Sequence, residues 1–418
     1  MAGFFSSEET KPKKIKERSC ITCGLYKDCV SPRMKPYGNF KLGILNIAEG
    51  SGEVEDSNGK PFQGRAGKLL QRTYRNLGID LFDDCLNINA VSCRPIDAKG
   101  NNRTPTNEEI ITCRRRVLRV IEEYKPKVII LLGFSAIFSV IGERWKKEIG
   151  TITKWRGWMI PDQDFGAWIC PTFHPSYVER AKEKTEVEEL IWKQDLQQAF
   201  NLVEAPFPKY KEPEIEVIED LDLLNYQTTH TDTFGNTKFR HIPELIAFDY
   251  ETTGLKPHAE GHEIICCSVA DSPDHVYVFM MPKTCRERRP FINILSNPNV
   301  KKIASNMKFE HSWSAFMFNQ PVEGWEWDTM IMSHILDNRR SITGLKFQTY
   351  VNFGVIDYAS EIAPYLEGDK NNANSFNRIK ELLKIPGGKE KLLKYNALDS
   401  IFEYRLMLRQ QTLLKLNS

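Results

Sequence analysis

Two acidic residues, Asp249 and Glu251, stand two positions apart at the end of a short apolar run in the stretch IAFDYETTGL, residues 246–255. In a β-strand, side chains at i and i+2 point to the same face, so both carboxylates are offered to the same space. Oxygen ligands of this kind suit hard divalent cations such as Mg²⁺. Charge at the end of a buried strand is costly unless something compensates it. The stretch therefore predicts a metal site rather than a solvated loop end.

Further downstream, three more residues have the chemistry and the placement to complete such a site. A buried strand predicted at residues 302–305 leads into NMKFEHSW, which puts Glu310 near the start of the next helix. The last predicted helix contains KYNALDSIFEYRL, with Tyr395 and Asp399 at i and i+4 and so on one helix face. Together with Asp249 and Glu251, these residues predict a centre for one or two divalent cations.

Residues 246–251, 263–269 and 275–280 read as strands and residues 285–295 as a helix, an order typical of ribonuclease H-like folds. With ASNMKFEHSW, DTMIMSHILDNRRSITGLKF and YNALDS, this region resembles the proofreading 3′-5′ exonuclease domain (DEDD type) of family A DNA polymerases, most of all those of large lytic phages. The resemblance implies that Asp249, Glu251, Glu310 and Asp399 hold two Mg²⁺ or Mn²⁺ ions and that Tyr395 orients the attacking water. Glu310 stands where the family usually has Asp.

After Leu416 only two residues remain, where a family A polymerase would begin its thumb, and the chain has no palm carboxylate motif or fingers helix. We therefore expect an exonuclease without a polymerase, unless the chain is a fragment or one half of a split enzyme.

Cysteine spacing carries the second chemical signal. The pair Cys20-x-x-Cys23 is followed by the single residues Cys93 and Cys113. Four such thiolates can hold zinc or an iron–sulfur cluster. Zinc ribbons usually supply a second close pair, so its absence favours iron–sulfur. Separate buried thiols are the alternative, and Cys29 and Cys85 are possible substitute ligands.

The first half of the chain alternates strand-like and helix-like patterns, which indicates an α/β domain. Strands are predicted at residues 42–47, 85–91, 128–132 and 167–171, and helices at 67–77, 107–124 and 178–203. Thr106, followed by Glu108 and Glu109, predicts the N-cap of the second helix.

Around the cysteines the chain resembles the family 4 uracil-DNA glycosylases, which are iron–sulfur proteins. The resemblance runs through AEGSGEVEDSNGKPFQGRAGKLL, NAVSCRP, NRTPTNEEIITC, TITKWRG and TFHPSYVER. It implies a parallel sheet between helical layers and a [4Fe-4S] cluster on Cys20, Cys23, Cys93 and Cys113. It also implies the residues that handle a base flipped out of the DNA stack: Phe62 stacks on it, Asn89 reads its edge, His174 stabilises charge on the leaving base, and Glu49 and Glu55 lie near the attacking water.

Two departures from the family pattern affect the predicted activity. Ala48 and Ser51 replace a Gly and a Pro that shape the loop under the base, and the insertion DAKGNN, residues 97–102, lengthens the segment between Cys93 and Cys113. A working glycosylase and a DNA-holding module therefore both stay open.

The Pro-rich stretch after residue 204 predicts a domain boundary. We expect a basic arm at residues 1–19, the iron–sulfur domain at 20–204, a linker at 205–213 and the exonuclease domain at 214–418. The first half is the more basic, with a cluster of arginines at 114–116 and 119, which favours DNA as partner. No apolar run suits a membrane helix, so a cytoplasmic protein is predicted, in the host cytoplasm if it is phage-encoded.

Two functions fit these features. One is a 3′-5′ exonuclease acting on single-stranded or frayed 3′ ends in viral DNA replication or repair. The other is a non-catalytic DNA-binding accessory subunit of a separately encoded or split family A DNA polymerase.

Overall fold

The computed structural model describes residues 20–181, 185–224, 229–231, 237–239 and 243–415. The predicted basic arm at residues 1–19 lies outside the described residues. The chain forms two compact units, the first containing residues up to Glu143 with Trp155–Gly157 and Ile169–Ala205, the second containing Arg144–Lys154, Trp158–Trp168 and the chain from Pro206. Residues 205–213 contain neither helix nor strand. Among the described helices, none combines the length and the apolar character needed to cross a membrane.

A five-stranded sheet forms the centre of the N-terminal half, in the order β2-β1-β3-β5-β4. Strand β1 pairs in parallel with both β2 and β3. These three strands are buried along almost their whole length, as expected for a parallel sheet covered on both faces. The strands are β1 (Ile44–Gly50), β2 (Cys85–Val91), β3 (Val128–Leu132), β4 (Ile160–Asp162) and β5 (Ala167–Thr172).

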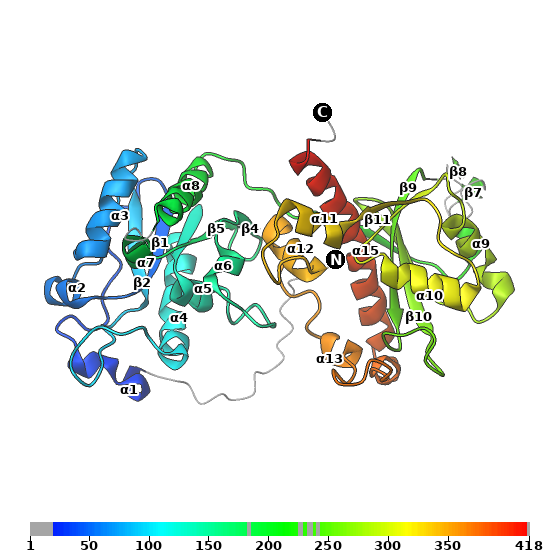
Figure 1. Cartoon of the computed structure of the whole chain (residues 1–418), viewed down its shortest axis with the longest axis horizontal. Helices are drawn as coiled ribbons and strands as arrows, with labels where there is room; N and C mark the ends of the chain where they lie inside the picture. Colours follow the sequence, from blue (N-terminus) through cyan, green and yellow to red (C-terminus); the bar gives the residue numbers. More distant parts are fainter. Residues whose placement is uncertain (1–19, 182–184, 225–228, 232–236, 240–242, 416–418) are drawn as a thin grey trace. The chain divides into compact units, whose positions relative to one another are not determined.

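Helices cover this sheet on both sides, with α3 and α8 on one side and α4 and α5 on the other (Figure 1). Thr106 and Glu109 form a reciprocal capping box at the start of α4, so the predicted helix 107–124 has the predicted boundaries. The helices are α1 (Cys20–Cys23), α2 (Glu53–Asn58), α3 (Arg65–Asn76), α4 (Asn107–Tyr124), α5 (Phe134–Val140), α6 (Ile152–Trp155), α7 (Pro175–Ala181) and α8 (Val187–Asn201), with a 3₁₀ turn at Leu25–Asp28.

The single helix predicted at residues 178–203 is wrong, because α7 ends at Ala181 and α8 begins at Val187. Thr185 Oγ1 accepts a hydrogen bond from Val187 N at 3.1 Å. A Thr side chain bonded to nearby backbone offers the chain an alternative to the helical hydrogen bond, and here it interrupts a segment whose Glu and Lys residues favour helix.

The second unit contains a six-stranded sheet in the order β13-β12-β9-β10-β11-β6. Strand β9 lies inside the sheet, antiparallel to β10 and parallel to β12. The strands are β6 (Glu214–Val217), β9 (Leu245–Thr252), β10 (Ile264–Ser272), β11 (His275–Met280), β12 (Lys301–Ala304) and β13 (Trp325–Asp328). The mixed sheet with flanking helices confirms the predicted α/β class.

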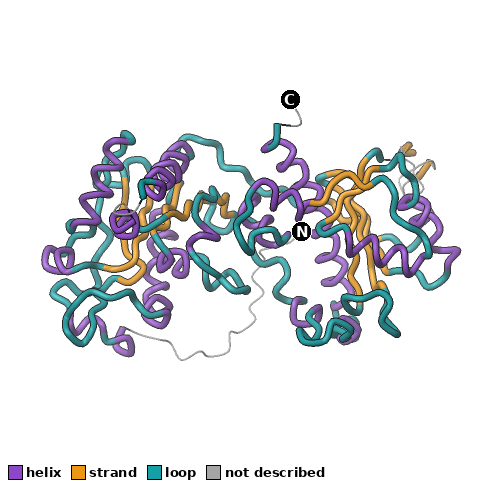
Figure 2. The backbone as a smooth tube through the Cα atoms, in the orientation of Figure 1, coloured by secondary structure: helices purple, strands orange, loops and turns teal. Residues whose placement is uncertain are grey.

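Alternation along β9 decides which face its carboxylates occupy. Ile246, Phe248 and Tyr250 belong to a core shared with residues of α9 and α10, whereas Ala247 belongs to the core shared with α15. Because side chains alternate with period two, Asp249 and Glu251 lie on the α15 side. Figure 2 shows the strands between these helices. The helices are α9 (Cys285–Leu295), α10 (Lys308–Phe318), α11 (Thr329–Leu336), α12 (Leu345–Phe353), α13 (Ala363–Leu366), α14 (Ile379–Leu382) and α15 (Gly388–Leu413), with a 3₁₀ turn at Leu221–Leu224.

The polar composition of residues 228–238 is typical of an exposed loop, yet part of this segment forms strands. Thr229–Thr231 (β7) and Thr237–Phe239 (β8) pair as a small antiparallel sheet, while residues 232–236 lie outside the described part of the chain. Thr and Phe favour strands, which outweighs the overall polarity of the segment.

Candidate active sites

Three carboxylates meet at one point of the second unit. Asp249, Glu251 and Asp399 each offer an oxygen, and these oxygens all lie within 4.8 Å of one another. Asp249 and Glu251 come from β9, and Asp399 comes from the middle of α15, which packs on that face of the sheet. The structure thus brings together two sequence motifs almost 150 positions apart in a geometry that a divalent cation fits.

Burial and mutual repulsion disfavour the ionised form of these three carboxyl groups when no cation is bound. Burial, followed by the charge of Asp399, raises the pKa of Asp249 well above its ordinary value. Burial and the charges of Asp249 and Asp399 likewise raise the pKa of Glu251. Asn396, one turn before Asp399 on the same helix, donates from Nδ2 to Asp249 Oδ2 at 2.7 Å. Asn396 thus orients Asp249, and a bound cation would relieve the repulsion that raises these pKa values.

The other two predicted nuclease residues lie beside the trio. Glu310, at the start of α10, is 2% exposed and close enough for its charge to raise the pKa of Glu251. Tyr395 faces the carboxylates from α15, and burial together with Asp399 and Glu251 raises the pKa of its phenol well above 10. A phenol of this kind holds its proton at neutral pH, which suits an orienting role better than that of a general base.

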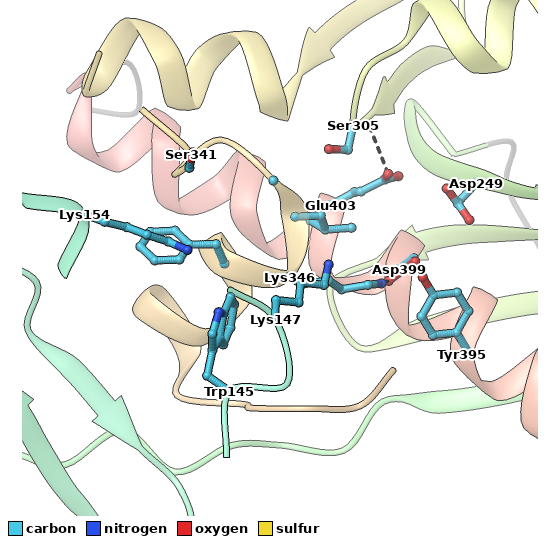
Figure 3. Close-up of a pocket in the computed structure, with 13 residues that line it drawn as sticks. Trp145, Lys147, Lys154, Asp249, Ser305, Ser341, Lys346, Tyr395, Asp399 and Glu403 are labelled. Carbon is cyan, nitrogen blue, oxygen red and sulfur yellow. Dashed lines mark hydrogen bonds and ion pairs between the residues drawn. The ribbon is translucent and has the colours of Figure 1, made fainter. Parts of the chain in front are cut away.

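Lys346 and Tyr358 also contact the site, and our sequence reasoning missed both. Lys346 Nζ forms an ion pair with Asp399, lies 4.3 Å from the ring centre of Tyr358 and lies 4.0 Å from that of Tyr395. The hydroxyl of Tyr358 donates to Asp399 Oδ1 at 2.6 Å. The ammonium is directed at the carboxylates along one wall of a pocket of about 340 Å³ (Figure 3). Lys346 belongs to the GLKF end of one motif that carries the polymerase resemblance. It is too far from Asp399 in the sequence for strand or helix periodicity to predict their contact.

Asp328 holds the loop that precedes Glu310. Its Oδ2 accepts from Met307 N at 2.9 Å, and its Oδ1 accepts from Asn306 N at 3.2 Å. Asp328 also caps α11, accepting from Met330 N and Ile331 N at 2.9 and 3.1 Å. One carboxylate thus ties the turn before α10 to the start of α11.

We expect Asp328→Ala to lower the free energy of unfolding of the second unit by about 3 kcal/mol, because charged hydrogen bonds contribute about 1.5–3 kcal/mol and a helix cap about 1. Urea unfolding followed by circular dichroism measures this. Asp328→Asn keeps one acceptor oxygen and should lose less. A loss below about 1 kcal/mol for the alanine variant would contradict this role.

In the first unit, the predicted carboxylates lie around the carboxyl end of β1. Glu49 Oε2 accepts from the hydroxyl of Ser135 at 3.0 Å, and burial raises the pKa of Glu49 despite that bond. Glu55, on α2, accepts from Gly64 N through Oε1 at 2.8 Å, so it braces the turn before α3. The two carboxylates therefore have different partners, a side-chain hydroxyl for Glu49 and a backbone N–H for Glu55.

Phe62 and Asn89 are both buried, with 6% and 7% exposure. Phe62 has a backbone φ of 58°, a left-handed conformation that a bulky residue rarely adopts. Gly67 permits it, since a Cβ at Gly67 would lie 2.2 Å from the Phe62 carbonyl carbon. Strain of this sort is found preferentially at functional sites. Asn89, on β2, donates from Nδ2 to the hydroxyl of Ser51 at 3.2 Å.

His174 follows β5, and a Cβ on Gly133 would lie 3.0 Å from its own Cβ. Burial, aided by the charge of Arg180, lowers the pKa of His174 to about 4, so the imidazole is neutral at neutral pH. Ser176 N donates to Nδ1 at 3.3 Å, which leaves the proton of the neutral ring on Nε2. A neutral ring with a free N–H can donate to an anionic leaving base.

The predicted cluster ligands gather at one side of the first unit. Cys93 and Cys113 are buried in an apolar patch that Cys23 borders. Burial, together with the charges of the nearby Cys93, Cys23 and Cys20, raises the pKa of Cys113 to about 11. Arg33 N donates to Cys93 Sγ at 3.3 Å, a contact that stabilises a thiolate. Cys93, Cys113 and Cys23 thus share apolar surroundings, and Cys20 lies near enough for its charge to act on Cys113, which suits thiolate ligands of a cluster.

Comparison with known proteins identifies the family of the N-terminal half. Residues 35–197 match the family model of the uracil DNA glycosylase superfamily. The chain is 37% identical over 187 residues to the type-4 uracil-DNA glycosylase of Thermotoga maritima, across 44% of this chain and 90% of the relative. Through its N-terminal half, the chain belongs to the type-4 uracil-DNA glycosylase family. The type-4 enzyme of Saccharolobus solfataricus is also 37% identical, over 38% of this chain and 72% of the relative.

The C-terminal half carries a 3′-5′ exonuclease domain, since residues 230–368 match that family model. The DNA polymerase of Bacillus phage SP01 is 24% identical over 336 residues, which is 73% of this chain but only 34% of the polymerase. The solved structure of Brucella melitensis NrnC with bound Mg²⁺ matches 49% of this chain and 82% of NrnC at 17% identity, with a TM-score of 0.31.

Within the glycosylase-family half, Arg114 of the predicted DNA-facing arginine cluster is buried inside the protein. It is 7% exposed and donates to Ser139 O and Phe138 O at 2.9 and 2.6 Å, at the carboxyl end of α5. Basic side chains commonly stabilise helix carboxyl ends in this way. Arg116 and Arg119 instead line a small pocket beside Asn89.

Proposed function

We propose that this chain is a metal-dependent 3′-5′ DNA exonuclease of the proofreading type, joined to a uracil-DNA glycosylase domain and acting in viral DNA replication or repair. The observation that carries the nuclease is the trio Asp249, Glu251 and Asp399, whose oxygens lie within 4.8 Å. The similarity to a phage polymerase supports the viral setting and a role at DNA 3′ ends.

Asp249, Glu251 and Asp399 would hold the divalent cations, Mg²⁺ or Mn²⁺, with Glu310 beside them. Bound there, such cations would supply the charge that activates a water molecule and neutralises the phosphate. Tyr395, kept protonated, would orient that water through its hydroxyl. Lys346 would release Asp399 to a cation and offer its ammonium to the phosphate of the DNA strand.

The direct test is shortening of a 5′-labelled single strand by the full chain with Mg²⁺ or Mn²⁺. A ladder of products that shorten from the 3′ end is expected. If the wild-type chain leaves the strand intact both with Mg²⁺ and with Mn²⁺, the nuclease assignment fails.

For the first half, we propose a [4Fe-4S] cluster on Cys20, Cys23, Cys93 and Cys113 and a base pocket that uses Phe62, Asn89 and His174. Glu49 and Glu55 would lie near the attacking water. Family membership and the neutral imidazole of His174 support a working site. Ser51 in place of a proline gives Asn89 a hydrogen-bond partner within the protein, which a base must displace.

We expect Asn89→Ala to lower uracil excision at least about 10²-fold, because a pocket that loses a paired polar contact to its substrate loses several kcal/mol. The assay incubates uracil-containing single-stranded DNA and cleaves abasic sites with alkali. Asn201→Ala, an exposed residue at the end of α8, is the matched control. If the wild-type chain forms no uracil-dependent product, the first half is a DNA-holding domain and not a glycosylase.

The alternative is an accessory subunit of a separately encoded or split family A polymerase. The phage polymerase match spans 73% of this chain, more than the exonuclease region alone. Nuclease activity that appears only after a polymerase chain is added would favour this function over the free-standing enzyme.

A further inference from the structure

Glu403 is a buried carboxylate that has no role in the proposed nuclease mechanism. It lies one turn after Asp399 on α15, and side chains at i and i+4 share a helix face. Glu403 is 1% exposed and lines the same pocket as Asp249 and Asp399. Figure 3 shows its carboxylate beside that of Asp249.

The two oxygens of Glu403 have different surroundings. Oε1 accepts a hydrogen bond from Ser305 N at 2.9 Å. Oε2 is buried and has no hydrogen-bond partner within the described chain. A buried carboxylate oxygen without a hydrogen-bond partner destabilises the fold by several kcal/mol. We therefore expect a bound ligand to interact with this oxygen in the functional state.

Neighbouring charges identify that ligand as a cation. Burial and then the charges of Asp249, Glu310 and Asp399 raise the pKa of Glu403 well above its ordinary value. Glu310 also has a buried oxygen, Oε2, without a partner among the described residues. Both side chains lie outside the trio that can share one ion. Glu310 and Glu403, each with a buried unpaired oxygen, thus offer donors to a second cation beside the first.

We propose that Glu403 is a ligand of the second divalent cation of the exonuclease site, an inference that rests on the proposed nuclease function. Charge supports it, because two divalent cations and the ammonium of Lys346 together neutralise five carboxylates. Those five are Asp249, Glu251, Glu310, Asp399 and Glu403. Without Glu403 the same cations would leave the buried site with excess positive charge.

The test is Mn²⁺ binding to the full chain without DNA, followed by electron paramagnetic resonance of free Mn²⁺. The wild type should bind two ions. Glu403→Gln keeps an oxygen for Ser305 N and nearly the same shape but removes the charge, so we expect the weaker ion to bind about tenfold less tightly or to be lost. Glu390→Gln, exposed on the same helix, should match the wild type.

Thermal unfolding in EDTA separates metal binding from folding. Glu403→Gln should be at least as stable as the wild type without metal, and Mn²⁺ should raise its melting temperature less. If the glutamine variant does not fold, Glu403→Asp decides, because its shorter arm should also weaken the second ion. Unchanged Mn²⁺ binding by the folded variant overturns the proposal. A wild-type chain that binds no Mn²⁺ and cuts no DNA overturns the nuclease function itself.

Discussion

An Asp249→Asn variant should shorten single-stranded DNA about 10³-fold more slowly than the wild-type chain at saturating Mg²⁺. Asp249 belongs to the trio that offers oxygens within 4.8 Å, and the substitution removes one of those charges. A metal ion stabilises the charge of the transition state by several kcal/mol, and about 4 kcal/mol corresponds to about 10³ in rate. The measurement is the single-turnover rate on a 5′-labelled strand.

Folding is not expected to explain this loss. Asparagine keeps an oxygen that can accept from Asn396 Nδ2. Because repulsion and burial raise the pKa of Asp249, its charge destabilises the metal-free fold at neutral pH, and the variant should melt at the same or a higher temperature in EDTA. Asp369→Asn, at an exposed site, controls for the chemistry of the substitution. An Asp249→Asn chain with wild-type rates would remove the trio from the mechanism.

The second large effect is expected from Cys113→Ser. Cys113 is 5% exposed on α4, next to Cys93 and Cys23. Loss of one ligand should release most of the iron and abolish the visible absorbance of the purified chain. Metal binding contributes directly to folding, so the first unit should lose about 5 kcal/mol or more, a fall of about 10–20 °C in melting temperature. Iron analysis, absorbance and calorimetry measure these changes.

Two other cysteines provide the comparison. Cys285 is exposed on α9, and Cys285→Ser should change nothing. Cys29, a possible substitute ligand, donates its thiol proton to Leu25 O at 3.1 Å, which indicates a neutral thiol. Cys29→Ser should therefore keep the iron. If Cys29→Ser loses the iron while Cys113→Ser keeps it, Cys29 is a cluster ligand and Cys113 is not. A colourless wild-type protein loaded with zinc would contradict the cluster.

Much of the local structure follows from the sequence. The strands Cys85–Val91, Val128–Leu132 and His275–Met280 and the helices Asn107–Tyr124 and Cys285–Leu295 have the predicted bounds. Each is encoded by nearby residues: apolar runs specify the strands, and Thr106 and Thr284 cap the helices. Where a local bond at Thr185 competed with helix propensity, the prediction of one long helix failed.

By itself, the sequence determined that Asp249 and Glu251 share a strand face and that Tyr395 and Asp399 share a helix face, because the periods of strand and helix are local properties. Only the tertiary structure decided that these faces meet, with Lys346 paired to Asp399 and Tyr358 donating to it. It also decided that Glu403 is buried beside them with an unpaired oxygen. Such contacts join residues from different elements, and they form only when α15 packs on the sheet and α12 packs against α15.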